Sequence, residues 1–184
     1  DAFAINRYSE RRDGGNQFME IAGWSSGRDD LIMRGNGVVR HPGRLFGLAE
    51  RFIPKKQHWS FYGNLRYNAE GLGGVDRGGW TLYLEPNYAV NDDLSFFAGL
   101  ELQRNPDWLL WQDGNLLVTY GMDQAFLNAG AVWLIGSKQE LRVRLEALGL
   151  DAEAKRAWRV GADGRAVRSN EPLDDFALRV GTSM

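Results

Sequence analysis

The stretch QELRVRLEAL (Gln139–Leu148) decides the fold class, because its residues alternate between apolar and polar along the chain. One side of the alternation is apolar and the other is charged, with Leu141, Val143, Leu145 and Ala147 set against Arg142, Arg144 and Glu146. Successive side chains of a β-strand point to opposite faces of a sheet. This period of two therefore predicts a strand with one apolar face and one polar face.

The same alternation recurs along most of the chain. It is clear in Gln57–Asn68, Gly79–Ala89, Leu94–Arg104, Phe126–Ile135 and Phe176–Thr182, the last with Phe176, Leu178 and Val180 on its apolar side. Weaker versions cover Asp1–Tyr8, Asn16–Trp24 and Arg44–Phe52. The pattern predicts an all-β chain of about nine strands. Several windows reach about ten residues, longer than the average soluble strand and long enough to cross a bilayer at a tilt.

Aromatic residues lie near the ends of the apolar faces, and we interpret them as membrane-interface residues. They are Trp59, Tyr67, Trp80, Tyr88 and Trp133. Amphipathic rings prefer the headgroup level, and membrane β-barrels carry such aromatic girdles at both interfaces. A soluble sandwich or a lipocalin-like barrel would place the same rings in its core, so this second interpretation stays open.

The connections alternate between long and short from Ser25 onward. Long loops are expected at 25–43, 69–78, 105–125 and 149–175, and short turns at Pro54–Lys56, Val90–Asp93 and Gly136–Lys138. Long loops on one side and short turns on the other are typical of an antiparallel up-and-down transmembrane β-barrel. Asp113–Gly114 is a hairpin signal, so 105–125 is expected to be a hairpin above the membrane. Asp151–Arg159 is expected to form a short loop helix.

In a barrel of this kind the polar face lines the interior. The expected lumen-lining residues are Arg66, Glu85, Glu101, Gln103, Arg142, Arg144 and Glu146, accompanied by Asn64, Asn87 and Asn128. Charges of both signs at this density suggest a wet or salt-bridged lumen. In a soluble β-protein the same face would meet bulk water.

Composition excludes several classes of protein. The chain of 184 residues has no cysteine and two histidines, which excludes disulfides, thiolate nucleophiles and cysteine-based zinc sites. A net charge of −2 gives no basic balance for nucleic acid, so no nucleic-acid partner is expected. The densest apolar run, Ala129–Ile135, is far shorter than a membrane helix of about 18 residues.

Catalytic and metal-binding motifs give little signal. No P-loop, GxSxG, HExxH or EF-hand loop is present, and Gly71–Gly74 and Gly78–Gly79 lack the βαβ context of a dinucleotide site. Glu85 and Glu101 face one side from neighbouring strands, so an acid pair for glycoside hydrolysis remains an alternative to neutralised lumen charges. Asp29–Asp30 and Asp174–Asp175 are interpreted as solvated loop acids, with calcium binding as the alternative. No metal or cofactor is expected.

Four stretches carry a resemblance to a known bacterial family: Gly27–Gly37, Gly78–Pro86, Arg104–Trp111 and Met122–Leu127. With them the chain, from about Asn16 onward, resembles the C-terminal barrel region of an uncharacterised outer-membrane family. That region is a domain of unknown function, usually preceded by a family-nine-like carbohydrate-binding domain. The resemblance implies a Gram-negative outer-membrane location and sugar-linked binding, and it supplies no catalytic residue.

These observations predict that residues 1–184 form a single β-barrel segment in the bacterial outer membrane. Its expected role is non-enzymatic passage or docking of a ligand, with a glycan as a candidate. A glycan-acting outer-membrane hydrolase and a soluble carbohydrate-binding β-sandwich are the alternatives. Bacterial single-chain barrels have even strand numbers, so about nine strands predict an incomplete barrel that contacts lipid and pairs with further strands of the same protein or another chain.

Overall fold

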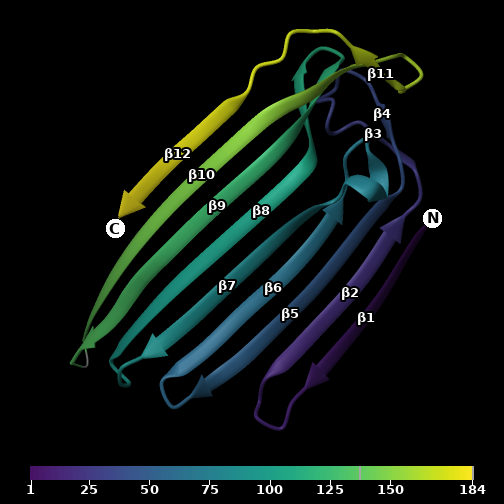
Figure 1. Cartoon of the computed structure of the whole chain (residues 1–184). Helices are drawn as coiled ribbons and strands as arrows, with labels where there is room; N and C mark the ends of the chain where they lie inside the picture. Colours follow the sequence, from purple (N-terminus) through teal and green to yellow (C-terminus); the bar gives the residue numbers. More distant parts are fainter. Residues whose placement is uncertain (137, 184) are drawn as a thin grey trace.

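The computed structural model describes residues 1–136 and 138–183, and it places most of them in one large antiparallel sheet (Figure 1). The strands follow the order β1-β2-β5-β6-β7-β8-β9-β10, and β11 and β12 both pair with β10. The longer strands are β1 (Ala2–Glu10), β2 (Asn16–Trp24), β5 (Arg44–Lys56), β6 (Trp59–Ala69), β7 (Gly79–Ala89), β8 (Leu94–Asp113), β9 (Leu116–Ile135), β10 (Gln139–Val160) and β12 (Phe176–Ser183). The all-β antiparallel prediction is confirmed.

The sheet is open within the described residues. It begins at β1 and ends at β12, and neither strand has a partner on its outer side among the described residues. Figure 1 shows β1 and β12 at opposite edges, both pointing toward the end of the sheet that carries the short turns. The register is continuous over most of its width, with irregularities in β5–β6, β8–β9 and β9–β10.

Long and short connections separate to the two ends of the sheet, as the sequence predicts. The short turns follow β1, β5, β7 and β9, and Ser137 of the last one lies outside the described residues. At the other end, residues 25–43 carry β3 (Gly27–Asp29) and β4 (Val39–His41), and residues 70–78 carry the 3₁₀ turn η1 (Gly74–Arg77). The short β11 (Ala166–Ser169) lies beyond β10.

The expected hairpin above the sheet is present. Residues Asn105–Asp113 of β8 pair with Leu116–Met122 of β9 around Gly114, beyond the ends of β6 and β7. Two register irregularities, between Asn105 and Trp108 and between Trp111 and Asp113, interrupt the alternation there. Such bulges increase local bend and twist, and they hide a strand from a search for strict period-two patterns.

One prediction about the connections is wrong. The expected loop 149–175 and the short helix at Asp151–Arg159 are largely strand, because β10 continues to Val160 and pairs with β9 throughout. A bulge between Ala154 and Arg156 shifts the register by one residue. The shift breaks the alternation in the sequence, and the Ala, Glu, Lys and Arg residues around it have high helix propensity. The strand partner overrides that local preference.

The largest fully buried side chains gather at the long-loop end. We call this region the cap: residues 105–122 of the β8–β9 hairpin, 152–160 of β10, and the segments 25–43, 70–78 and 161–175. Met33, Val39 and Leu117 form one cluster with Val160. Val118, Tyr120 and Met122 form a second with Leu150, Ala152 and Ala157. The register assigns the two clusters to opposite faces of the hairpin, so the cap has a small core on each side of it.

The glycines of segment 70–78 allow that segment to pack against the cap. A Cβ on Gly71 would lie 2.2 Å from Oδ2 of Asp107, and one on Gly73 would lie 2.8 Å from the same atom. Asp107 is buried and accepts a hydrogen bond from the backbone N–H of Gly73. These glycines therefore serve close backbone packing around a buried carboxylate.

No helix in residues 1–136 and 138–183 has the length and apolar character needed to cross a membrane.

Candidate functional site

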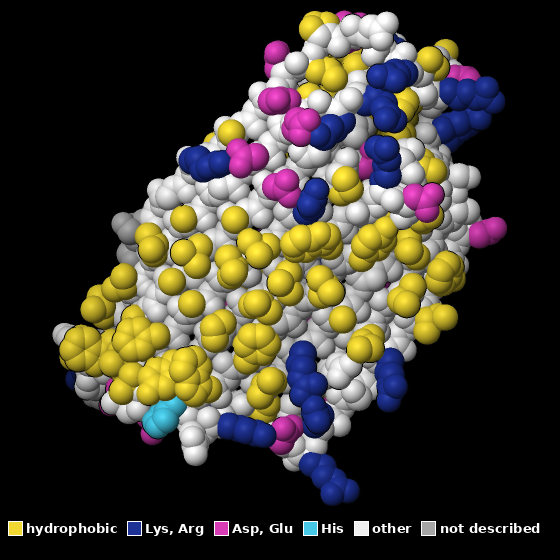
Figure 2. All heavy atoms as spheres, in the orientation of Figure 1, with side chains coloured by type: hydrophobic (Ala, Val, Ile, Leu, Met, Phe, Trp, Pro, Cys, Tyr) yellow, Lys and Arg dark blue, Asp and Glu magenta, His cyan; other side chains and the backbone are white. Residues whose placement is uncertain are grey.

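The register divides the sheet into two faces of opposite character. On one face, cross-strand rows such as Leu65–Leu82–Leu102 and Leu84–Leu100–Leu127–Ala147 are apolar throughout. We call this the belt face. Its side chains are well exposed, including Val143 at 50% and Leu145 at 48%. Figure 2 shows these side chains as a continuous hydrophobic band with charged groups above and below it.

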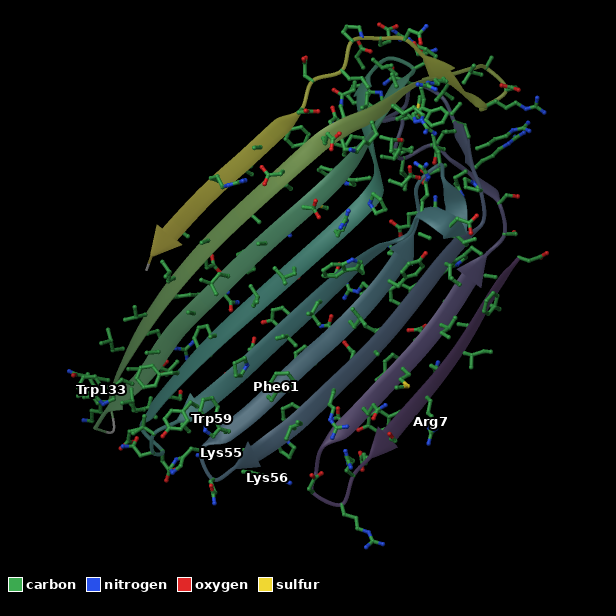
Figure 3. All side chains as sticks on the ribbon, viewed as in Figure 1. Arg7, Lys55, Lys56, Trp59, Phe61 and Trp133 are labelled. Carbon is green, nitrogen blue, oxygen red and sulfur yellow. The ribbon has the colours of Figure 1, made fainter. Side chains whose placement is uncertain are left out.

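The predicted interface aromatics lie at the two margins of this band. Trp59 is directly opposite Tyr88, and Tyr67 is directly opposite Trp80, so each pair joins β6 to β7 at one end. The rings of Trp59 and Tyr88 are 4.7 Å apart between centroids. Trp133 pairs with Leu94 near the short turns. Figure 3 shows Trp59 and Trp133 at that lower margin, with Lys55 and Lys56 just beyond Trp59.

The opposite face is mostly polar, and it carries the residues predicted to line a lumen. Its rows include Arg66–Thr81–Gln103–Gln124 and, from β6 to β9, Asn64–Tyr83–Glu101–Phe126. Across β9 and β10, Asn128 is opposite Glu146 and Gly130 is opposite Arg144. The register thus places Glu101 and Gln103 on β8, Arg66 two strands away on β6, and Arg142, Arg144 and Glu146 two strands away on the other side, on β10.

The two β10 arginines predicted to line the lumen, Arg142 and Arg144, have carboxylate partners on their own strand. Arg144 lies 2.7 Å from Glu146, and Arg142 contacts Glu140. These side chains are well exposed, so each pair contributes little to the free energy of folding. Their effect is to reduce the net charge that this edge presents on the polar face.

A cluster on the polar face is centred on two tyrosines, Tyr62 and Tyr83, that were assigned no role from the sequence. Tyr62 donates a hydrogen bond of 2.7 Å to Glu50 and accepts one of 3.2 Å from Asn64. On β7, Tyr83 donates to Glu85, which also accepts from Asn87 at 3.3 Å. The two tyrosine rings lie 6.0 Å apart between centroids. We call Glu50, Tyr62, Asn64, Tyr83, Glu85 and Asn87 the tyrosine cluster. Tyr, Asn and Glu at alternate positions of β6 and β7 are the signal that could have revealed it.

Asn128 adjoins the tyrosine cluster from β9. It is 8% exposed, and its Oδ1 has no hydrogen-bond partner among the residues that the structure describes. A Cβ on Gly99 would lie 2.1 Å from that oxygen and 2.9 Å from the hydroxyl of Tyr83. Gly99 therefore leaves the space in which the Asn128 amide and the Tyr83 hydroxyl meet.

The proposed acid pair is engaged in hydrogen bonds. Glu85 accepts from Tyr83 and Asn87, and Glu101 accepts from Gln124 at 3.2 Å. All three donors lie on the same face of the sheet as the carboxylates. Each carboxylate is therefore held as a hydrogen-bond acceptor among the polar side chains of this face.

No known relative guides the assignment. None of the three comparisons, with family models, curated proteins and solved structures, gives a match to this chain. The family resemblance stays a prediction, and function rests on the two faces themselves.

The apolar side of β12 lies on the unexpected face. Leu148 is opposite Val180, Leu150 is opposite Leu178, and Ala152 is opposite Phe176, so all three β12 residues lie on the polar face. Phe176 packs there against Tyr120 and Trp108, with ring centroids 5.3 and 6.1 Å away. Grouping Phe176, Leu178 and Val180 with the belt residues is therefore wrong, because alternation gives a strand two faces without saying which is which.

The acidic pairs of the loops have structural contacts. Asp29 accepts hydrogen bonds from the backbone N–H groups of Leu31 and Ile32, and it forms an ion pair of 3.0 Å with Arg44. Desolvation raises the pKa of Asp29, but these hydrogen bonds and the guanidinium outweigh it, and the net pKa is lowered. Asp175 accepts from the backbone N–H of Ala154. Within residues 1–136 and 138–183, no cluster of three or more His, Asp or Glu residues could hold a metal ion.

Proposed function

We propose that this chain is a segment of a bacterial outer-membrane β-barrel. The belt face lies in lipid, the polar face lines a hydrated interior, and the cap stands above the membrane on the outer side. The segment serves passage or docking of a polar ligand and is not an enzyme.

The main support for this proposal is the location of the buried core. The largest fully buried side chains, Met33, Leu117, Val39 and Thr119, are all in the cap, whereas the strands below it leave one whole apolar face exposed. Soluble monomers rarely expose an apolar surface that extends across many strands. Hydrocarbon is the environment in which such a surface is stable.

The height of the apolar band agrees with a bilayer. Asp123 and Trp133 mark its two margins on β9 and are ten residues apart. Ten residues span roughly 33 Å of strand, which projects to about 25 Å at a tilt of ~40°. A band of about 25 Å is typical of outer-membrane barrels.

Lipid also requires that the edges be paired. Backbone N–H and C=O groups on the outer sides of β1 and β12 would each cost several kcal/mol if left unpaired in hydrocarbon. In the membrane these edges therefore pair with further strands, from the same protein or another chain, which close the barrel.

The polar face favours a ligand rich in hydroxyl groups. The tyrosine cluster offers two aromatic rings together with amide donors and carboxylate acceptors, and a glycan can use both kinds of contact. The family resemblance points to the same ligand class and to the outer membrane.

Single-cysteine labelling tests the membrane proposal, because the chain has no cysteine of its own. Leu100→Cys and Val143→Cys place a label on the belt face, and the matched controls Glu101→Cys and Arg144→Cys place it on the polar face. In vesicles, we expect spin-labelled lipid to quench a fluorophore at 100 and 143, and aqueous iodide to quench one at 101 and 144. No quenching by spin-labelled lipid at 100 and 143, together with recovery of the protein without detergent, would identify a soluble sandwich instead.

A separate measurement tests the role of the polar face. In a vesicle swelling assay or in glycan binding, Tyr83→Ala with Tyr62→Ala should change uptake or affinity, and Val143→Ala should not. Glycan hydrolysis that is lost in Glu85→Gln with Glu101→Gln would contradict the non-enzymatic assignment.

A further inference from the structure

The polar face of strands β1 to β8 carries an excess of negative charge between the cap and the short turns. In these strands, all of which the structure describes, five glutamates share the face with one arginine, Arg66. The glutamates are Glu10, Glu20, Glu50, Glu85 and Glu101. Arg44, at the cap end of β5, is paired with Asp29 and does not offset them. This part of the face therefore attracts cations.

The hydrogen bonds of the tyrosine cluster use its hydroxyl donors and leave acceptors free. Tyr62 gives its single hydroxyl hydrogen to Glu50, and Tyr83 gives its own to Glu85. An ionised carboxylate can accept about four hydrogen bonds. Among the described residues, Glu50 accepts one and Glu85 accepts two. A ligand that complements this site must therefore bring hydrogen-bond donors.

Asn128 shows the same shortage of donors beneath the surface of the cluster. Its side chain is more than nine-tenths buried, and its Oδ1 accepts no hydrogen bond from the described residues. That oxygen and the Tyr83 hydroxyl both border the space left by Gly99. The Tyr83 hydrogen is already given to Glu85, so it does not serve Asn128. A ligand that donated to Glu85 in its place would free the Tyr83 hydroxyl to donate to Asn128.

Aromatic rings border the same carboxylates. Phe18 is directly opposite Glu50, and Tyr62 is directly opposite Glu85. Tyr62 thus adjoins both carboxylates, and its ring lies 6.0 Å from that of Tyr83 between centroids. Aromatic faces offer apolar contact area and attract cations. The site combines ring faces with uncompensated carboxylates.

We propose that the tyrosine cluster, together with Asn128, selects an amino sugar, that is, a glycan whose units carry a primary ammonium. The ammonium binds between Glu50 and Glu85, and the sugar ring lies against the rings of Tyr62 and Tyr83. Donation from the ammonium to Glu85 lets the Tyr83 hydroxyl turn to Asn128. The inference rests on the proposed docking of a glycan and names the class of glycan.

Other ligands match the site less completely. A neutral glycan brings hydroxyl donors but leaves the negative charge of the carboxylates uncompensated. An acidic glycan meets repulsion from the same carboxylates. A linear polyamine pairs with the carboxylates but has no ring to cover the aromatic faces. A glucosamine oligomer supplies the donors, the positive charge and the ring.

Isothermal titration calorimetry of the full chain in detergent micelles tests the proposal. The probes are the glucosamine tetramer, the N-acetylglucosamine tetramer, cellotetraose and spermidine. At about pH 5.5, a carboxyl of ordinary pKa is ionised and glucosamine carries its proton. We expect the glucosamine tetramer to bind about tenfold more tightly than each of the other probes, a difference of ~1.4 kcal/mol. Added salt should reduce this preference.

Matched variants separate local from overall charge. Glu50→Gln with Glu85→Gln keeps an oxygen acceptor for each tyrosine and removes two negative charges, so it should abolish the preference for the glucosamine tetramer. Asp92→Asn with Asp93→Asn removes the same charge in the exposed turn after β7 and should leave the preference intact. Equal effects of the two double variants would contradict the site.

The outcomes for the four probes distinguish the two proposals. Equal binding of the three tetrasaccharides would overturn the selection of an amino sugar and leave glycan docking in place. Spermidine bound as tightly as the glucosamine tetramer would overturn the role given to the aromatic rings, and the amino-sugar site with it. A chain that binds none of the tetrasaccharides would overturn glycan docking itself.

Discussion

The backbone N–H of Gly73 donates a hydrogen bond of 2.5 Å to Oδ2 of Asp107, a buried carboxylate 34 positions along the chain. This contact joins segment 70–78 to the β8–β9 hairpin and so joins two parts of the cap. The backbone N–H of Asp107 in turn donates to the side chain of Asn105. Asp107 therefore holds its place in β8 and binds a separate loop at the same time.

Asp107→Ala should loosen the cap. The substitution leaves the N–H of Gly73 without its acceptor, which costs about 1–3 kcal/mol when the group is partly buried. Urea unfolding in detergent, followed by tryptophan fluorescence, measures the change in the free energy of unfolding. Asp76→Ala in the same segment is the control, because Asp76 is exposed. Equal effects of the two substitutions would contradict the role given to Asp107.

Gly71→Ala should destabilise the cap by steric conflict. The added Cβ would lie 2.2 Å from Oδ2 and 2.3 Å from the backbone oxygen of Asp107, so β8 or the segment must move. We expect a loss of roughly 1–3 kcal/mol, in the range of other overpacked sites. Gly47→Ala on the belt face meets nothing closer than 3.7 Å and should change stability little. Thermal unfolding of both variants makes the comparison, and a stable Gly71→Ala would refute the close packing.

Leu117→Ala and Leu127→Ala should have very different effects, although both truncate a leucine of β9. Leu117 is fully buried in the cap, so its truncation creates a cavity and should cost about 2–5 kcal/mol. Leu127 is 41% exposed on the belt face and contacts detergent or lipid, so its loss should cost much less. Urea unfolding in micelles gives both values. A larger effect at Leu127 would mean that a protein layer, not lipid, covers the belt face.

The lowered pKa of Asp29 predicts acid sensitivity of segment 25–43. A carboxyl whose folded-state pKa lies below its unfolded value stabilises the fold above the unfolded value, here near 3.8, and loses that contribution as pH falls through the folded pKa. The difference in melting temperature between the wild type and Asp29→Asn should therefore be full at pH 7 and should shrink below pH 4. Asp30→Asn, at an exposed neighbour, is the control. A difference that stays constant from pH 7 to pH 2.5 would rule out this linkage.

Much of the fold follows from the sequence, because period-two alternation is a local signal. Strands such as β6 and β7 were predicted almost to the residue, and so was the separation of long loops from short turns. Where a bulge shifts the phase, as between Ala154 and Arg156, the local pattern resembles a helix and the prediction is wrong. Alternation also could not tell whether Phe176, Leu178 and Val180 lie on the belt face or on the polar face, because that depends on the pairing with β10.

The candidate sites, like the fold, were predictable from the sequence only in part. Membership of the polar face was predictable for Arg66, Glu85 and Glu101 from alternation alone. The contacts within the tyrosine cluster and the position of Asn128 beside it depend on register between strands. No single-strand pattern contains that information, so these features required the structure.

The shared direction of β1 and β12 constrains how this sheet can be completed. If added strands close the sheet, every neighbouring pair is antiparallel only when the number of added strands is odd. Two copies related by a rotation about the membrane normal would instead join β1 of one to β12 of the other through parallel seams. Counting the strands in an intact assembly, or finding a parallel seam in it, therefore distinguishes a barrel completed by added strands from a ring of identical copies of this sheet.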